Sequence, residues 1–213
     1  MIKPSSGWRS INWKELWHYK DLFYFLVWRD IKSRYAQSVL GIGWAVIQPV
    51  FSMIVFTVVF GKMAKIDSNG VPYAIFSFTA LVPWTYFAGS LSASSGSLLG
   101  ASGMMTKVYF PRLIIPLAPV ISKLIDFFIA LILLACMMYY FGFTPSIEII
   151  YLPFLILLMM FTASGLGMWF TALSIQYRDI KYGMGFFVQL LMYAAPVVYP
   201  SSNVPDAYRS IYG

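Results

Sequence analysis

The stretch "RDIKSRYAQSVLGIGWAVIQP" (residues 29–49) joins a highly charged segment directly to an apolar one. Its first six residues carry four charges, and the fifteen residues that follow carry none. No Gly-Pro or Asn-Gly turn separates the two halves. Such a change is typical of a chain that passes from an aqueous surface into hydrocarbon, where a charged side chain is costly.

The composition of the whole chain points to the same solvent. Of the 213 residues, 60% are hydrophobic and only 11% are charged, and the mean hydropathy is +0.73. A soluble domain usually carries about 25% charged residues because it needs a hydrated exterior. The single cysteine, Cys136, lies in an apolar run and provides no disulfide framework. We therefore interpret the chain as an integral membrane protein.

Five apolar runs have about the length that a membrane helix needs. The hydrocarbon core requires about 20 apolar residues per helix. The third run follows a proline-rich segment that begins at Pro111, and the fifth is the shortest. The sequence predicts an all-α polytopic helical bundle with five spans, at residues 39–61, 71–95, 124–143, 149–175 and 182–199.

Lysine and arginine are distributed unevenly between the two sides of these spans. Twelve lie before the first span or in the loops after the second and fourth spans, and three lie on the opposite side. Positive residues are retained on the cytoplasmic side. The distribution predicts a cytoplasmic N-terminus. It also accounts for the net charge of +7 without a nucleic-acid partner.

Residues 13–35 have the pattern of an amphipathic helix. Apolar side chains recur at steps of three and four, and an amphipathic helix rich in tryptophan and basic residues lies in the membrane interface. We expect a cytoplasmic N-terminal segment with an interfacial helix (residues 1–36) followed by a transmembrane domain (37–213). A basic cluster near its end either anchors this helix or has a role in function: Arg29, Lys32 and Arg34.

Proline, glycine and polar residues interrupt the predicted spans. Pro49 and Pro83 predict kinks, either for packing or beside a wet cavity. Small residues at 89–103 and 163–167 favour close helix packing, with a flexible gate as the alternative for the first segment. We name as a hypothetical translocation path the polar or aromatic side chains deep in the spans: Trp44, Gln48 and Trp84.

Lys123 and Asp126 are three positions apart near the start of the third span. Charges inside a membrane are often functional. Both groups are expected within about a turn of the interface, where they can pair with each other or reach the headgroups. We favour a local ion pair over a role in transport.

The sequence offers little for catalysis. The one histidine, His18, lies in the predicted surface helix, and we find no carboxylate pair, Ser/His/Asp set or metal-ligand cluster at one membrane depth. The phosphate-binding pattern G-x-x-x-x-G-K-[ST] is absent. We predict no catalytic, cofactor-binding or metal-binding residues, and we expect the energy source to be external.

Three segments, in order, resemble one known family. They are residues 29–49 quoted above, "KVYFPRLIIPLAPV" (107–120) and "YRDIKYGMGFFVQLLMYAAPVVYPSSNVP" (177–205). The family is the membrane permease of ABC-2-type exporters for polysaccharides, O-antigen, capsule and teichoic acid. The resemblance covers residues 13–213. It implies a permease subunit, not an enzyme, in the bacterial cytoplasmic (inner) membrane.

The resemblance also implies partners and site residues. The expected assembly has two identical six-helix permeases and two ABC ATPase subunits. The ATPase subunits bind ATP and Mg²⁺ and open a path through the permeases for a lipid-linked polysaccharide. Membrane lipids are expected to surround the permeases. Arg29, Lys32 and Arg34 correspond to the entrance for the lipid headgroup. The residues expected to couple the permease to the ATPase are Lys107, Tyr109, Phe110, Pro111, Arg112, Arg178 and Asp179.

The family has a sixth helix beyond the position that corresponds to Gly213, so we expect a C-terminally truncated sequence. An alternative cargo is a drug or a small lipid, moved by the same fold. A membrane enzyme such as a glycan acyltransferase is a third reading, which the missing acid and base residues weaken.

Overall fold

The structure is a computed structural model, and it describes residues 13–36, 40–63, 65, 70–177, 179–195 and 197. This part of the chain is helical and has no strands. The elements are α1 (Trp13–His18), α2 (Lys20–Tyr35), α3 (Gly43–Phe56), η1 (Thr57–Met63), α4 (Tyr73–Ser95), α5 (Ser97–Gly100), α6 (Ser102–Met105), α7 (Ile114–Ser122), α8 (Leu124–Tyr140), η2 (Ile147–Tyr151), α9 (Leu152–Gln176) and α10 (Asp179–Ala194).

Four helical runs are long and apolar enough to cross a membrane. They are Gly43–Met63, Tyr73–Ser95, Ile114–Tyr140 and Ile147–Gln176, with 21, 23, 27 and 30 residues. These runs confirm the first four predicted spans. The predicted fifth span is represented by α10, which has 16 residues. Most of its predicted end, up to residue 199, lies outside the described residues.

The third run begins ten residues earlier than the sequence predicted. Pro116 lies in the first turn of α7, where its missing N–H leaves no helical hydrogen bond unmade. Pro119 lies inside the helix, which nevertheless continues through Lys123 into α8. The part of the proline-rich segment from Ile114 onward therefore belongs to the helical run, because only one of its two prolines, Pro119, stands where a backbone donor is needed.

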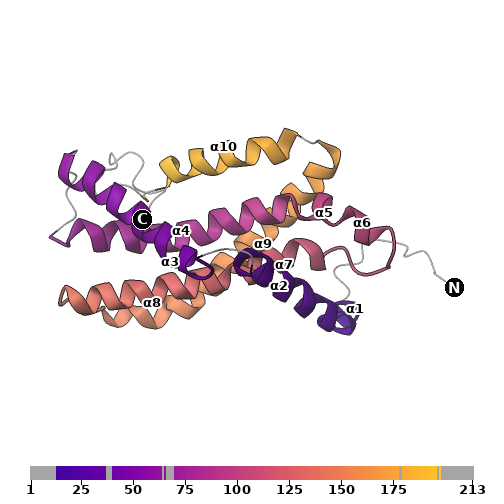
Figure 1. Cartoon of the computed structure of the whole chain (residues 1–213), viewed down its shortest axis with the longest axis horizontal. Coiled ribbons are helices and arrows are strands. Elements are labelled where there is room, and N and C mark those ends of the chain that lie inside the picture. Colours follow the sequence, from indigo (N-terminus) through magenta and orange to yellow (C-terminus); the bar gives the residue numbers. More distant parts are fainter. Residues whose placement is uncertain are drawn as a thin grey trace.

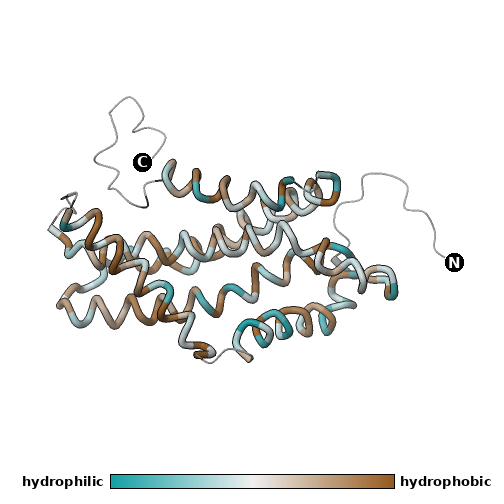
Figure 2. The backbone as a smooth tube through the Cα atoms, turned by 45° about the horizontal axis from the view of Figure 1, so that its top comes forward, coloured by the Kyte–Doolittle hydropathy of each residue, from teal (hydrophilic) through white to brown (hydrophobic). Residues whose placement is uncertain are grey.

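The long helices lie side by side, and the chain alternates between the two ends of the bundle (Figure 1). The short helices α1, α5 and α6 and the turn into α10 gather at one end, together with α2. Most of the hydrophilic segments lie in that half, whereas the long helices are largely apolar (Figure 2). The segments predicted to be cytoplasmic are thus brought to a common end.

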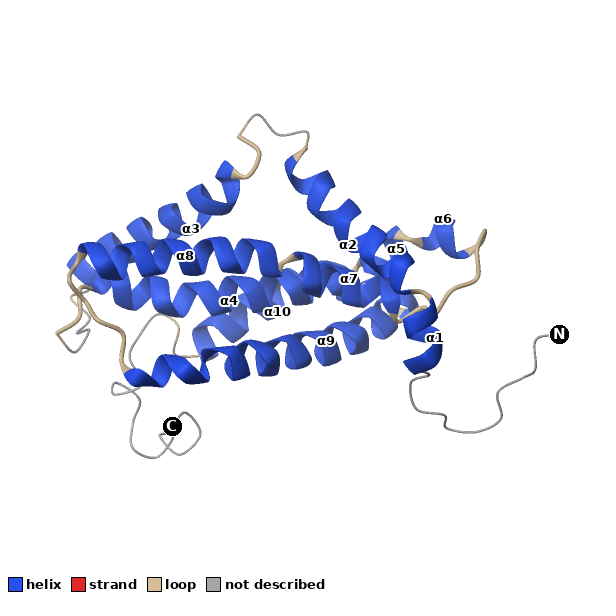
Figure 3. Ribbon diagram, turned by 90° about the horizontal axis from the view of Figure 1, so that it is seen from below, coloured by secondary structure: helices blue, strands red, loops and turns tan. Residues whose placement is uncertain are grey.

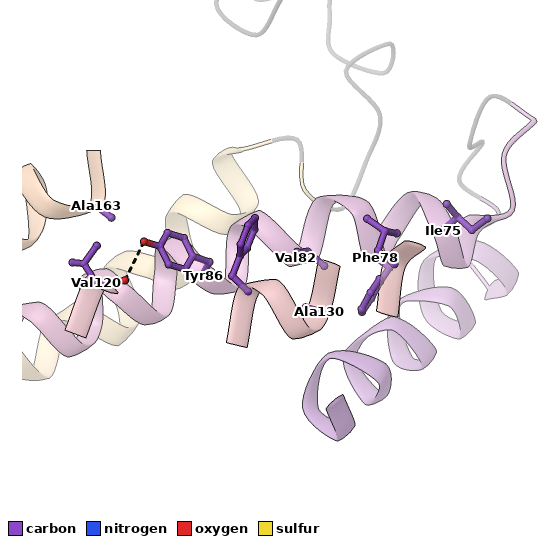
Figure 4. Close-up of a cluster of buried hydrophobic side chains, with 9 residues drawn as sticks. Ile75, Phe78, Val82, Tyr86, Val120, Ala130 and Ala163 are labelled. Carbon is purple, nitrogen blue, oxygen red and sulfur yellow. Dashed lines mark hydrogen bonds between the residues drawn. The ribbon is translucent and has the colours of Figure 1, made fainter. Parts of the chain in front are cut away.

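Helix α4 forms the centre of the bundle and supplies Ile75, Phe78, Val82 and Tyr86 to the largest core cluster (Figure 4). Facing them are Val120 of α7, Ala163 of α9, and residues of α8 that include Ala130. The Tyr86 hydroxyl donates to the carbonyl of Val120 at 3.1 Å. A buried tyrosine is stabilised when its hydroxyl has such a partner.

Small residues bring α4 and α9 into close contact. Ser94 donates to the Pro116 carbonyl at 2.8 Å, and Thr171 donates to the Ser94 carbonyl at 2.7 Å. A Cβ added at Gly167 would lie 2.6 Å from the Ser94 hydroxyl oxygen. The packing interpretation of the small residues is thereby confirmed at Ser94 and Gly167, because only small side chains allow backbones to approach this closely.

Helices α1 and α2 confirm the predicted helix at 13–35, with a turn at Tyr19. The apolar stripe has a different environment from the expected one. Leu26 is 1% exposed and packs on Ile114 and Ala118 of α7, so the stripe is covered by protein and not by lipid. Trp17, Tyr24 and Trp28 stay exposed on the remaining surface of these helices.

Candidate functional site

A cluster of charged and polar side chains joins the end of α2 to the start of α8. The carboxylate of Asp126 accepts hydrogen bonds from Arg34 at 2.7 Å, from Lys123 at 3.3 Å and from the hydroxyl of Tyr35. The expected Lys123–Asp126 ion pair is confirmed. Arg34 and Tyr35 are additional partners that the spacing of Lys123 and Asp126 did not indicate.

The local structure explains how these side chains meet. Lys123 occupies the junction between α7 and α8, and Asp126 lies in the first turn of α8, so the two share one helix face. Arg34 and Tyr35 lie in the last turn of α2. Because α2 packs along α7 through Leu26, its last turn lies next to the start of α8.

The cluster carries two positive charges and one negative charge. The side chains of Arg34, Lys123 and Asp126 are 28%, 25% and 26% exposed, respectively. Lys123 lies nine residues into the helical run from Ile114, about 14 Å along its axis. Ionisable groups at such places usually face a bundle interior or a water-filled cavity.

A cavity of about 850 Å³ lies beside this cluster, between the end of α2 and helices α3, α4 and α8. Among the described residues that line it, the charged ones are Arg34, Lys123 and Asp126. Polar and aromatic side chains make up much of the remaining wall: Tyr35, Trp44, Gln48, Phe51, Ser52, Thr85, Tyr86 and Phe127. The cavity therefore combines charged, polar and apolar groups in its lining.

The structure brings together only part of the predicted translocation path. Trp44 and Gln48 both line this cavity. Trp84 does not; it packs against the cluster of Leu81 and Val197, with its ring 6.0 Å from that of Phe87. Successive residues of a helix point to different faces. Trp84 therefore belongs to a different side of α4 from Thr85 and Tyr86.

The basic cluster of α2 is divided in the same way. Arg34 faces Asp126, whereas Arg29 pairs with its neighbour Asp30 at 2.8 Å and is half exposed. Arg29 lines a second cavity of about 540 Å³, next to α5, α6 and α7, and Arg34 borders this cavity as well. Lys32 is exposed. Of the three cations, only Arg34 reaches Asp126, and the predicted role of Arg29, Lys32 and Arg34 at a headgroup entrance stays a prediction.

The segment after α6 forms a third cavity, of about 470 Å³, with α1 and the end of α9. Lys107, Tyr109 and Arg112 are exposed, and the Tyr109 hydroxyl donates to the Glu15 carboxylate at 3.1 Å. This hydrogen bond and the negative charge of Glu15 raise the pKa of Tyr109 above its ordinary value. The contact holds the segment against α1.

Phe110 differs from its neighbours in this segment. It is 5% exposed and packs in a cluster with Leu98, Ala101 and Ile115, so its side chain is not available to a partner protein. Its predicted role in coupling to an ATPase stays a prediction. Pro111 is partly buried at the edge of the cavity. Asp179 is exposed at the start of α10, and Arg178 lies outside the described residues.

Comparison with known proteins identifies the family. Residues 21–213 match the family described as "ABC-2 type transporter". The chain belongs to this family. It is 28% identical over 193 residues to an O-antigen export system permease protein of Myxococcus xanthus, covering 91% of this chain and 74% of that protein.

Two further relatives have related names. An O-antigen export system permease protein of Klebsiella pneumoniae is 26% identical over 192 residues, covering 90% of this chain and 73% of that protein. A polysialic acid transport protein of Escherichia coli is 20% identical over 190 residues, with coverages of 85% and 71%. The predicted ABC-2 family and the polytopic helical bundle are confirmed.

Within this ABC-2 transporter the acidic residue of the site could have been found from the sequence. Asp126 is the only acidic residue in any of the five predicted spans. Such a residue calls for a positive partner. The sequence places Lys123 three positions away as such a partner. The pairing of Asp126 with Arg34 could not be predicted in this way, because it depends on the packing of α2 on α7. No group of three or more His, Cys, Asp or Glu residues in the described part of the chain could hold a metal ion.

Proposed function

We propose that this chain is the permease subunit of an ATP-driven exporter that moves a lipid-linked polysaccharide across the bacterial inner membrane. The observation that carries the proposal is the similarity, along most of the chain, to permeases named for export of O-antigen and polysialic acid. The cavity beside Arg34 and Lys123 supports it, since it combines positive charge with apolar walls.

The proposal places ATP and Mg²⁺ on separate ATPase subunits that dock at the end holding α1, α5 and α6. Lys107, Tyr109 and Arg112 are exposed there and are suited to contact a partner protein. The excess of lysine and arginine in the same set of loops supports a cytoplasmic location for this end, and hence a cytoplasmic N-terminus.

The proposed permease acts as a homodimer. Among the described residues of α3, only Ala45 is buried, and Phe51, Ile54 and Val55 expose apolar side chains. In Figure 3, α3 and α2 slope away in opposite directions, and α3 lies at the edge of the bundle. An apolar face of this kind suits lipid or a second copy, and a second copy would provide the other wall of a path wide enough for a glycan.

The second candidate is an exporter of a drug or a small lipid. The apolar part of the cavity, formed by Trp44, Phe51 and Phe127, favours this candidate because it would suit a hydrophobic cargo. The two cargoes differ in what accumulates when transport stops.

The test is deletion of the gene in the source bacterium, with complementation by the wild-type gene. We expect surface polysaccharide to disappear, and lipid-linked polysaccharide to accumulate at the cytoplasmic face of the inner membrane. An ATPase-inactive strain is the matched control and should show the same accumulation. Normal surface polysaccharide with a lower drug resistance would reject the polysaccharide cargo in favour of the second candidate.

A further inference from the structure

Arg34 and Lys123 converge on a single atom. Both side-chain nitrogens contact Oδ2 of Asp126, at 2.7 Å and 3.3 Å, and Tyr35 holds the other carboxylate oxygen. One negatively charged oxygen at this position is therefore bound by two cations from different helices. An oxygen of another anion that reached the same position would meet the same two donors.

We propose that this cavity binds a phosphate or diphosphate group between Arg34 and Lys123, and that Asp126 is a built-in counter-ion which the incoming anion displaces. The inference rests on the proposed function, because a lipid-linked cargo would present such a group. It assigns the anion to Arg34 and Lys123 and not to the three basic residues of α2 together.

Charge favours the exchange. With Asp126 in place, the cluster carries two positive charges and one negative charge. A phosphate bears up to two negative charges and three acceptor oxygens, which match an arginine fork and a lysine ammonium better than one carboxylate does. With both anions present the negative charges would exceed the positive ones. Repulsion between the two anions then drives the Asp126 carboxylate out of its position between Arg34 and Lys123.

The side chain of Lys123 is guided toward this position by close packing. A Cβ added at Gly89 of α4 would lie 3.4 Å from Lys123 Cε, so the lysine stem passes directly over this glycine. Arg34 is oriented by a second contact, with its other terminal nitrogen 3.5 Å from the Ser122 hydroxyl. The two cations are thus positioned before any ligand enters.

The rest of the cavity suits an amphiphile. Its volume of about 850 Å³ lies within the usual range of ligand pockets, which is about 300–1,000 Å³. Gln48, Ser52 and Thr85 add hydrogen-bonding groups to its lining, and Trp44, Phe51 and Phe127 add apolar surface. A phosphate joined to a prenyl chain would find partners for both of its parts.

The test measures binding to the full-length chain in detergent micelles by isothermal titration calorimetry. The probes are farnesyl diphosphate, inorganic pyrophosphate and farnesol. We expect Asp126→Asn to bind farnesyl diphosphate at least about tenfold more tightly than the wild type, since the competing charge is gone. Adding Arg34→Gln to this variant should cancel the gain without leaving an unpaired carboxylate.

Two comparisons make the result specific. Asp30→Asn removes a carboxylate of α2 that pairs with Arg29 away from this cavity, and it should leave the affinity within about twofold of wild type. Lys123→Gln in the otherwise wild-type chain should weaken binding, which tests the site even where Asp126→Asn fails to fold. Farnesol should show no dependence on Asp126.

The outcomes separate the claims. Equal or weaker binding of farnesyl diphosphate by Asp126→Asn overturns the inference, even where deletion of the gene abolishes polysaccharide export. Tighter binding by Asp126→Asn, together with normal polysaccharide export after deletion of the gene, supports the anion site and rejects the polysaccharide cargo. An equal gain for inorganic pyrophosphate identifies free phosphate as the ligand source, and a gain confined to farnesyl diphosphate identifies a lipid headgroup.

Discussion

The guanidinium of Arg34 lies 2.7 Å from the carboxylate of Asp126, although 92 positions separate the two residues along the chain. This contact connects the last turn of α2 to the first turn of α8. It gives α2 a polar attachment to the bundle in addition to the apolar packing of Leu26 on α7.

Removal of the Asp126 carboxylate should destabilise the protein. Asp126→Ala leaves Arg34 and Lys123 without their shared counter-ion. We expect a loss of about 2 kcal/mol in the free energy of unfolding. This loss is smaller than for a fully buried ion pair because the three side chains are partly exposed. Titration with SDS in mixed micelles measures this change. Asp30→Ala is the matched control and should cost less than about 1 kcal/mol, because its partner Arg29 is half exposed. Equal losses in the two variants would contradict the importance of the cluster.

Tyr109 and Phe110 are neighbours with opposite environments, 72% and 5% exposed. Phe110→Ala should lower the free energy of unfolding by about 3–5 kcal/mol, because it removes a ring from the cluster with Leu98 and Ile115. Tyr109→Ala should change stability by less than about 1 kcal/mol.

Tyr109→Ala should nevertheless reduce copurification of the proposed ATPase about fivefold or more, since tyrosines are enriched among the residues that carry most of the binding energy of an interface. Retention of the ATPase at the wild-type level would remove Tyr109 from the docking surface.

Arg112 offers a more direct test of coupling. Its side chain is exposed beside the third cavity, so Arg112→Gln should leave expression and unfolding unchanged. We expect a several-fold lower rate of ATP hydrolysis by the proposed complex. Loss of a charge at an interface slows association of the two proteins and weakens their binding by about 1 kcal/mol. Hydrolysis assays on the reconstituted complex measure it, with Arg29→Gln as an exposed control on α2. Hydrolysis equal to that of the control would separate Arg112 from coupling.

The contact between Tyr109 and Glu15 should depend on pH. Glu15 raises the pKa of Tyr109 above its ordinary value of 10.0, mainly by accepting its hydrogen bond. A raised pKa means that the contact stabilises the fold at neutral pH and that this contribution is lost as the pH rises through the folded-state pKa. Ultraviolet difference titration between wild type and Tyr109→Phe should show a midpoint above 10. Glu15→Gln should shift this midpoint downward; an unchanged midpoint would indicate another cause.

Two glycines of α9 provide a matched pair for helix packing. Gly167→Ala places a Cβ 2.6 Å from the Ser94 hydroxyl oxygen, and we expect a loss of about 1–3 kcal/mol as α4 and α9 move apart. Gly165 has no neighbouring atom within 4 Å of such a Cβ. Gly165→Ala should therefore be neutral or should stabilise the helix by up to about 1 kcal/mol. Thermal unfolding in detergent compares them, and similar behaviour would contradict the close approach of the helices.

The spans could be predicted well because each depends on a local property. A run such as residues 71–95 is apolar over the length that hydrocarbon requires, and α4 has nearly the same bounds. The start of the third span was less accurate, because Pro116 and Pro119 suggested a break. Pro116 lies in the first turn of α7, where no backbone donor is needed, and the helix continues past Pro119. The prediction for Lys123 and Asp126 succeeded for the same reason as the spans, since three positions on one helix determine their distance.

The sequence by itself determined which segments enter the membrane and that α2 would be a helix, because apolar length and helical periodicity act within a single segment. Only the tertiary structure decided that Arg34 faces Asp126 while Arg29 turns away, and that Trp44 and Gln48 share a cavity from which Trp84 is absent. Those outcomes depend on the rotation and docking of one helix against another. In this bundle they are set by the packing of α2 on α7 and of small residues between α4 and α9.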